Sequence, residues 1–355
     1  MTDLSVGDPG PGTVPAGTDL IELGGPALQV GVVALGARLA VLRAPDRDGT
    51  FADVVLGLDP DGYRDDRAFL GATVGRFANR IDGGTFVLDG RRHTVPCNEN
   101  GVALHGGPDG FDRQVFAADP VVTGPDGSRS LTLRRTSPDG ENGFPGTLDV
   151  AVTYAVRGAE LHIEHTATTD APTVVNLTNH AYFNLTGHGG TVEGHRVRIP
   201  ADHFLPVDDR LIPAGGPAPV AGTPFDLRTP TPLGRHLRAP HPQLARTRGY
   251  DHTFVLDRPA GADLALAAHV EDPGSSRTLT VLTDQPGVQF YSGNFLDGTI
   301  RLRDGTAVRQ GDAFCLEPQH YPNSPNEPDF PSTVLRPGER YRSRIVLRFG
   351  LIEPR

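Results

Sequence analysis

The runs GTLDVAVTYAV (146–156) and AELHIEHTAT (159–168) lie next to each other and alternate apolar with polar residues. Side chains on a strand point to opposite faces with a period of two, so this alternation is typical of β-strands. Similar runs bounded by Gly, Pro and Asp are FADVVLGL (51–58), GTFVLDG (84–90), RSLTLRRT (129–136), DHTFVLD (251–257), RTLTVLTD (277–284), GVQFYSG (287–293) and RSRIVLRFG (342–350). Strands at this spacing predict an all-β protein, a large antiparallel sandwich or barrel.

Helices are disfavoured along the whole chain. Its 355 residues include 44 Gly and 33 Pro, spread throughout, and neither residue is tolerated well inside a helix. The best helical candidates are short, 61–70 and 233–246, and prolines interrupt the second. We therefore expect few or no long helices.

The domain organisation is predicted from where the composition changes. The loop-rich region 213–248 lies between strand-like stretches of the same character, so we expect an excursion from one domain rather than an interdomain linker. Residues 1–17 are acidic and rich in Gly and Pro, and they predict a loose N-terminal tail. Residues 18–355 then form a single domain.

Composition also excludes several classes of partner. The net charge of −10 disfavours nucleic acid. No run approaches the roughly 18 apolar residues that a membrane span requires, and the N-terminus does not resemble a secretory signal. Two cysteines, Cys97 and Cys315, make no disulfide framework, so we expect a cytoplasmic protein.

The stretch VVNLTNHAYFNL (174–185) places many polar groups in a strand-like segment. By alternation its apolar face, which Asn179 interrupts, carries Val175, Leu177, Ala181, Phe183 and Leu185. The other face carries Asn176, Thr178, His180, Tyr182 and Asn184. That polar face has no Lys, Glu or Arg, and Asn is depleted in strands. Two interpretations stay open for it, an ordinary solvated face and the lining of a cleft.

The run LHIEH (161–165) offers His162, Glu164 and His165 as candidate metal ligands. Alternation places Leu161 and Ile163 inward, with His162 and Glu164 on the opposite face. A solvated strand face is therefore the favoured interpretation.

Other segments also combine polar or ionisable residues with Gly, Asn and aromatic residues. They are GATVGRFANRI (71–81), NENGVALHGG (98–107), YDHTFVL (250–256), VQFYSGNFLDG (288–298) and FCLEPQHYPNSPN (314–326). The last of them puts Glu317 at the end of an apolar strand that Pro318 stops. A carboxylate there is either a functional group or a member of a buried ion pair.

Six of these motifs, in order, resemble the galactose mutarotase (aldose 1-epimerase) family over roughly residues 20–350: GRFANRI, NGVALHGG, NLTNHAYFNL, YDHTF, GVQFYSGNFLDG and FCLEPQ. The resemblance implies one β-sandwich of the large supersandwich kind, with an open sugar cleft on one sheet. It also implies interconversion of the α and β anomers of a free hexose such as D-galactose or D-glucose, without a cofactor.

The resemblance also implies roles for individual residues. Glu317 matches the family's general base and His180 its general acid. The family's sugar-binding positions match Asn79, Arg80, His105, Asp251 and Gln289. Tyr182 lies on the same face as His180 by alternation, so we expect it to line the cleft. Ala181 departs from the family pattern, because many relatives have serine after the histidine, and this bears on sugar preference.

Mutarotation needs a base for the proton on O1 and an acid for the ring oxygen, and a carboxylate with an imidazolium is the minimal pair. Desolvation at the end of an apolar strand is expected to raise the pKa of Glu317. His180 is expected to begin protonated, which its ordinary pKa of about 6.5 permits if acceptors or a carboxylate such as Asp251 stand nearby. No metal or nucleotide is required.

Three alternatives are weaker. A hexose-6-phosphate 1-epimerase would add a basic clamp, for which the candidates are Arg76, Arg80, Arg246 and Arg248. A non-catalytic carbohydrate-binding protein predicts loss of the acid or the base. A glycosidase needs two carboxylates flanking the bond, and only Glu317 stands out clearly, with Asp251 a distant second. The expected partner is a small sugar, and the chain is expected to be a monomer or a homodimer.

Overall fold

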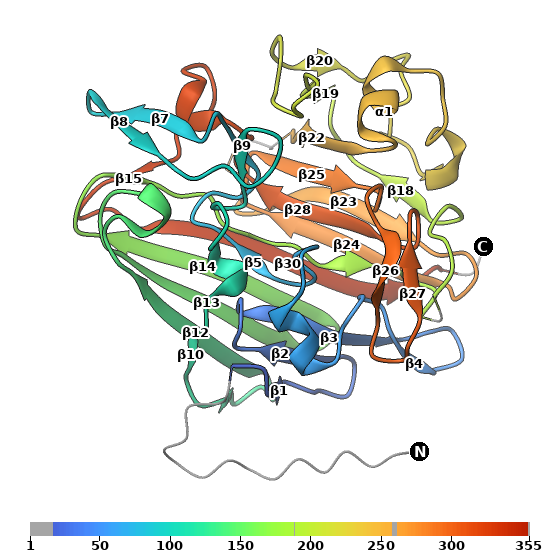
Figure 1. The fold of residues 1–355 in the computed structure, drawn as a ribbon. Coiled ribbons are helices and arrows are strands. Elements are labelled where there is room, and N and C mark those ends of the chain that lie inside the picture. The colour runs from blue at the N-terminus through green and yellow to red at the C-terminus, as the bar shows by residue number, and fades with distance from the viewer. Residues whose placement is uncertain (1–16, 188, 258–260, 354–355) are drawn as a thin grey trace.

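The structure, a computed structural model, describes residues 17–187, 189–257 and 261–353, so the predicted tail at 1–17 lies almost wholly outside the described residues. The predicted all-β class is confirmed (Figure 1). In the described ranges the only α-helix is α1 (Pro242–Thr247), and 3₁₀ helices occupy Pro60–Arg64, Phe111–Arg113, Glu141–Gly143, Leu233–Arg235 and Ser324–Asn326. None of the helices in these ranges has the length and apolarity needed to cross a bilayer.

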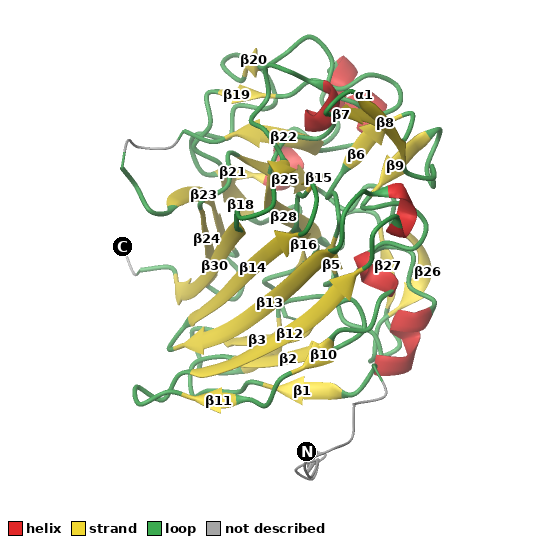
Figure 2. Cartoon of the chain, turned by 90° about the vertical axis from the view of Figure 1, so that its left-hand side faces the viewer, coloured by secondary structure: helices red, strands yellow, loops and turns green. Residues whose placement is uncertain are grey.

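The largest sheet is antiparallel, and ten of its strands lie in the described residues. Their order is β10 (Ala117–Ala118), β12 (Arg129–Ser137), β13 (Leu148–Arg157), β14 (Glu160–Thr169), β30 (Tyr341–Leu351), β24 (Arg277–Thr283), β23 (Ala265–Glu271), β18 (Arg196–Arg198) and β21 (Thr231–Pro232), with β11 (Val122–Thr123) beside β12. Figure 2 shows the long strands β12, β13 and β14 side by side.

The hairpin β13–β14 is formed by the two alternating runs at 146–156 and 159–168. Its register runs from Leu148 opposite Thr169 to Arg157 opposite Glu160, and Gly158 makes the tight turn with a φ of 58°. On β14 the expected alternation is confirmed, because Leu161 and Ile163 are buried while His162 and Glu164 are partly exposed.

Polar contacts occupy the outward face of β14. Nε2 of His162 lies 2.8 Å from Glu160, and Arg342 donates to Glu164 at 2.9 Å. His165 points the opposite way and is fully buried. These three candidates therefore do not converge on one point, in agreement with the solvated-face interpretation.

Two smaller antiparallel sheets complete the sandwich. The strands described for the first are, in order, β17 (Tyr182–Phe183), β28 (Phe314–Gln319), β25 (Gly287–Tyr291), β22 (Asp251–Val255), β19 (His203–Phe204) and β20 (Ala218–Pro219). The second has β1 (Leu20–Glu22), β2 (Gln29–Val33), β3 (Arg38–Pro45) and β4 (Phe51–Asp53). Side chains from all three sheets share one hydrophobic cluster, among them Leu131, Val152, Ile163, Phe254, Phe290, Phe314, Val32 and Leu39.

The remaining described strands form short antiparallel pairs. They are β15 (Thr173–Val174) with β29 (Val334–Leu335), β16 (Thr178–Asn179) with β5 (Thr73–Val74), β26 (Asp297–Arg301) with β27 (Ala307–Arg309), β6 (Arg80–Asp82) with β9 (Val102–Leu104), and β7 (Thr85–Leu88) with β8 (Arg91–Thr94).

The region 213–248 contributes to both layers. Its strand β20 joins the sheet of β28, and β21 joins the large sheet. Helix α1 lies at the end of the expected helical candidate 233–246 and begins at Pro242, because proline is tolerated at the first helical position.

Alternation on β25 and β28 sets the position of the site. Phe314 and Leu316 enter the hydrophobic core, so Glu317 points to the opposite face of β28. On β25, Phe290 enters the core and Gln289 points away from it. The face turned away from the large sheet therefore carries the polar side chains.

Candidate active site

A cleft lies on that outer face, and all eight residues predicted from the sequence line it. They are Asn79, Arg80, His105, His180, Tyr182, Asp251, Gln289 and Glu317. Its volume is about 190 Å³. The site is thus assembled from strands at the centre of the sheet and from loops that fold over them.

The strand side of the cleft is a row of side chains on β22, β25 and β28. The register places Thr253 opposite Gln289, and Gln289 opposite Glu317. Nε2 of Gln289 donates to Asp251 at 2.6 Å, and the Thr253 hydroxyl donates to Oε1 of Gln289 at 2.5 Å. Both ends of the amide are therefore engaged, which fixes its orientation.

The loop side is organised by a reciprocal contact between Asn79 and His105. The backbone N–H of His105 donates to the Asn79 carbonyl at 3.0 Å, and the N–H of Asn79 donates to Nδ1 of His105 at 3.1 Å. Both residues have positive φ, 66° and 52°. A neutral imidazole that accepts at Nδ1 carries its proton on Nε2, so His105 has a hydrogen-bond donor on its other nitrogen.

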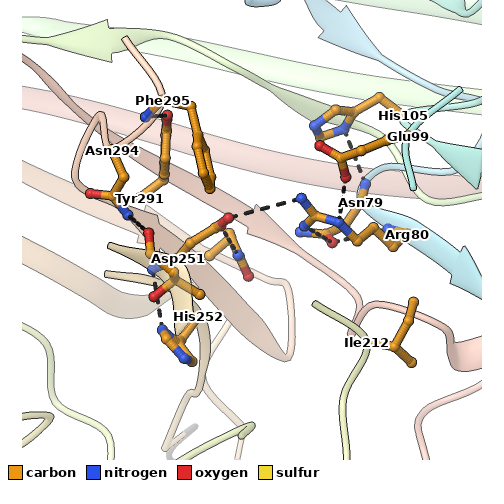
Figure 3. Close-up of polar contacts among 12 residues, drawn as sticks. Asn79, Arg80, Glu99, His105, Ile212, Asp251, His252, Tyr291, Asn294 and Phe295 are labelled. Carbon is orange, nitrogen blue, oxygen red and sulfur yellow. Dashed lines mark hydrogen bonds and ion pairs between the residues drawn. The ribbon is translucent and has the colours of Figure 1, made fainter. Parts of the chain in front are cut away.

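Arg80 connects the two sides (Figure 3). Its Nε donates to Glu99 at 2.8 Å, and its Nη2 lies 4.0 Å from Oδ2 of Asp251. Glu99 is about one-third exposed, whereas Arg80 and Asp251 are buried. The guanidinium is therefore held between a carboxylate at the rim and one on the sheet.

The two residues expected to do the chemistry lie side by side. Nε2 of His180 is 3.7 Å from Oε2 of Glu317, and both side chains are buried. The His180 ring stacks on Tyr182, with centroids 5.1 Å apart, and meets the His105 ring edge-on at 5.2 Å. Phe69, whose φ is 60°, contacts both imidazoles.

Burial shifts both members of this pair toward their neutral forms. It raises the pKa of Glu317 well above its usual value, the nearby negative charge of Asp251 adds to the rise, and Arg80 opposes it. Burial lowers the pKa of His180 to about 4. The raised pKa of Glu317 was expected. The expectation that His180 begins protonated is wrong for the protein without bound sugar, because burial favours the neutral ring. The carboxylate whose charge favours the protonated form of His180 is Asp66 and not the expected Asp251.

The polar face of 174–185 is only partly a cleft lining. His180 and Tyr182 line the cleft, whereas Asn176 and Asn184 use their amides to hold backbone carbonyls of other segments. Thr178 is buried away from it. Neither of the two open interpretations, a solvated face or a cleft lining, therefore describes the whole polar face, because the segment forms only the two short strands β16 and β17.

The candidate phosphate clamp does not assemble. Of its four arginines, Arg80 alone lines the cleft. Arg76 is buried and donates to Ser137 and to nearby carbonyls. Arg246 pairs with Asp209, and Arg248 lies over the Phe295 ring at the rim.

One group of side chains has the composition of a metal site. Single donor atoms of His105, His180 and Glu317 lie within 4.8 Å of one another. Nδ1 of His105, however, is occupied by the Asn79 N–H, so its Nε2 bears a proton and has no lone pair for an ion. Metal ligation requires a neutral imidazole with a free lone pair, and the group therefore fits proton donation better than metal binding.

Several lining residues were missed from the sequence. They are Arg67, Ala68, Phe69, Glu99, Leu104, Tyr291, Phe295, Leu296 and Ile300. Glu99 and Tyr291 stand inside the segments 98–107 and 288–298 that the sequence singled out, and membership of these segments was the available signal. Phe69 offered none, because its placement depends on a left-handed backbone conformation.

This fold and this site define a class of β-sandwich enzymes that act on sugars by acid–base chemistry. The model of the aldose 1-epimerase family matches residues 19–348, and the chain belongs to that family. It is 44% identical over 345 residues to the galactose mutarotase of Sus scrofa, covering 96% of this chain and 97% of that protein. It is 40% identical to the aldose 1-epimerase of Escherichia coli K12, covering 88% and 90%.

Solved structures agree with these sequence relatives. An aldose epimerase homologue from C. elegans superposes with a TM-score of 0.85 at 33% identity, covering 94% of this chain and 99% of that one. A galactose 1-epimerase from Lactobacillus acidophilus superposes with a TM-score of 0.82 at 29% identity, covering 94% and 96%. The expected sandwich fold and the family resemblance are thereby confirmed.

Proposed function

We propose that the protein is an aldose 1-epimerase that interconverts the α and β anomers of a free aldohexose such as D-galactose or D-glucose. The observation that carries the proposal is the buried pair of Glu317 and His180, whose facing atoms are 3.7 Å apart within a cleft. The names of the relatives, galactose mutarotase and aldose 1-epimerase, support the same activity.

Glu317 is assigned as the base that takes the proton from O1. Its Oε2 is buried and has no hydrogen-bond donor among the described residues, so it is free to accept one from substrate. As the O1 proton leaves, the C1–O1 bond becomes a carbonyl and the bond from C1 to the ring oxygen breaks. The released electron pair stays on the ring oxygen, which takes up a proton.

His180 is assigned as the acid that supplies the second proton. Because the pKa of Glu317 is raised and that of His180 is lowered, the pair as a whole holds one proton near neutral pH. A sugar hydroxyl donating to Glu317 stabilises its carboxylate form, so the single proton moves to His180. Rotation about C1–C2 and the reverse transfers close the ring on the other face with no net change in protons.

Asn79, Arg80, His105, Asp251 and Gln289 are assigned to sugar binding, with Tyr182 as part of the wall. Together they offer amide, guanidinium, imidazole and carboxylate groups to a ring of hydroxyls. The fixed amide of Gln289 and the anchored Arg80 reduce the ordering required when sugar binds. No step uses a metal or a nucleotide.

Polarimetry of freshly dissolved α-D-galactose and α-D-glucose tests the proposal. The protein is expected to accelerate the approach to the equilibrium rotation, and heat-denatured protein serves as the control. Proton NMR exchange between the two anomeric signals at equilibrium shows that only C1 is inverted. Activity on hexose 6-phosphate alone would support the phosphate alternative, and binding without exchange would support a carbohydrate-binding protein. A monomer or homodimer in the cytoplasm stays a prediction.

A further inference from the structure

Cys315 lies directly behind the proposed acid. It is fully buried on β28, two residues before Glu317, and the register places it opposite Tyr182 on β17. Its Sγ is 3.7 Å from Nδ1 of His180, while Nε2 of the same ring faces Oε2 of Glu317 at 3.7 Å. The imidazole therefore bridges a thiol and a carboxylate of one strand, with one nitrogen toward each.

We propose that Cys315 is a positioning residue that selects the tautomer of His180 and keeps its protonated form acidic. The proposal rests on the proposed role of His180 in anomer interconversion. An S–H group donating to Nδ1 leaves the proton of the neutral ring on Nε2, the nitrogen that faces Glu317. When the ring takes up a second proton, Nδ1–H donates to the sulfur instead.

The thiol keeps its own proton throughout. Burial raises the pKa of Cys315 well above its usual value, and the negative charges of Glu317 and Asp251 add to the rise. The sulfur therefore acts as a neutral hydrogen-bond partner and not as a nucleophile. A catalytic or ligating histidine is more often backed by a carboxylate or a carbonyl, which stabilises the imidazolium. A thiol is a weak acceptor, so the imidazolium in this protein gives up its proton more readily.

A second observation supports this tautomer. Oε2 of Glu317 is buried and has no hydrogen-bond donor among the described residues. With its proton on Nε2, His180 presents that proton toward the carboxylate oxygen and the cleft. Whenever Glu317 is in its carboxylate form beside a neutral ring, a proton on Nδ1 would leave two lone pairs facing each other across 3.7 Å and the buried oxygen without a donor.

Other groups around the ring also influence its charge. Its own backbone carbonyl favours the charged form, as does the carboxylate of Asp66, and Arg38 opposes it. His105 and Tyr182 contact the ring through their own aromatic rings. Among the described side chains, the thiol of Cys315 is the hydrogen-bond partner of Nδ1.

Three variants separate tautomer selection from packing. Cys315→Ala removes the group at Nδ1, Cys315→Ser restores a donor of similar size, and Cys97→Ala is the matched control, because Cys97 is exposed. Protein labelled with ¹⁵N-histidine is measured by NMR near neutral pH, and the His180 signals are assigned by their loss in His180→Asn. We expect a protonated Nε2 in the wild type, Cys97→Ala and Cys315→Ser, and a mixture of tautomers in Cys315→Ala.

Kinetics give the second measurement. We expect kcat of Cys315→Ala to fall about tenfold with little change in KM, in the range seen when partners of catalytic groups are removed. Cys315→Ser should recover part of that loss in kcat. It should also move the acid limb of the pH profile to higher pH, because a hydroxyl accepts a hydrogen bond from the imidazolium better than sulfur does. If Cys315→Ala fails to fold, the shift of the acid limb of the pH profile in Cys315→Ser tests the proposal instead.

The proposal would be overturned if Cys315→Ala kept both the tautomer and the kcat of the wild type. It would also be overturned if the His180 signal of the wild-type protein came from a ring protonated on Nδ1. The NMR measurement does not depend on activity. If the wild type fails to accelerate mutarotation, the proposed function is wrong, yet the tautomer still tests the role of Cys315.

Discussion

Nε2 of His180 and Oε2 of Glu317 face each other at 3.7 Å, and burial shifts the pKa of each group toward its neutral form. This relationship explains how two buried residues with opposite pKa shifts can act as an acid and a base in one reaction. It also means that the pH dependence of activity belongs to the pair and not to either residue alone.

The pH profile should therefore differ from that of an exposed histidine. The lowered pKa of His180, about 4, marks the point below which the pair gains a second proton and the base is lost. The raised pKa of Glu317 marks the alkaline limb, above which the shared proton is lost. We expect kcat/KM, corrected for spontaneous mutarotation, to be retained as the pH falls from neutrality to near 5. A steep fall with a midpoint of about 6.5, the ordinary histidine value, would contradict this account.

His180→Asn tests the acid. The change removes proton donation but keeps a polar side chain, so turnover should fall by about 10²-fold or more. Because the ring borders the cleft, loss of fold stability should be small compared with the several kcal/mol, roughly 3–5, of a large core deletion. The mutarotation rate and the thermal unfolding midpoint are measured on one preparation. The control is His162→Asn, on the outer face of β14. A destabilised His180 variant with full activity per folded molecule would mean that the ring is structural.

Glu99→Gln tests how Arg80 is held. Glu99 accepts from Nε of Arg80 at 2.8 Å and is partly exposed, so its loss should loosen the guanidinium without touching the pair. We expect KM for the hexose to rise by about threefold to tenfold with kcat nearly constant, which is the pattern of lost ground-state binding. Steady-state kinetics by polarimetry measure both parameters. An unchanged KM would show that Arg80 does not depend on this contact.

Metal independence follows from the hydrogen bond between the Asn79 N–H and Nδ1 of His105. This bond leaves a proton on Nε2, and the imidazole cannot also offer a lone pair there. Dialysis against EDTA should therefore leave the mutarotation rate unchanged, with buffer-dialysed protein as the control. A rate that falls and is restored by zinc or another divalent ion would show that His105, His180 and Glu317 act as ligands.

The strands and their faces were predictable because alternation is local. In the run 161–165 alternation placed Leu161 and Ile163 inward and His162 and Glu164 on the opposite face, and the structure agrees. In 174–185 alternation identified the apolar face, whose residues Val175, Leu177, Ala181, Phe183 and Leu185 all enter the hydrophobic core. It did not predict that Asn176 on the other face would donate to the backbone carbonyls of Ala78 and His320.

The charge state of the site could not be predicted from sequence. The pKa of His180 depends on burial by segments distant in the sequence, including the loop that carries Phe69. The placement of Arg80 between Glu99 and Asp251 likewise depends on contacts between separate loops and strands. Such long-range geometry leaves no mark in any single motif.

The most direct test of the central claim is the rate at which Glu317→Gln equilibrates fresh α-D-galactose. Glutamine keeps the size and hydrogen bonding of the side chain but removes its basicity. We expect turnover to fall by at least about 10²-fold relative to wild type, while galactose still binds in a calorimetric titration. Glu164→Gln, on the solvated face of β14, should retain full activity. Near-normal turnover of Glu317→Gln would contradict the assignment of Glu317 as the base.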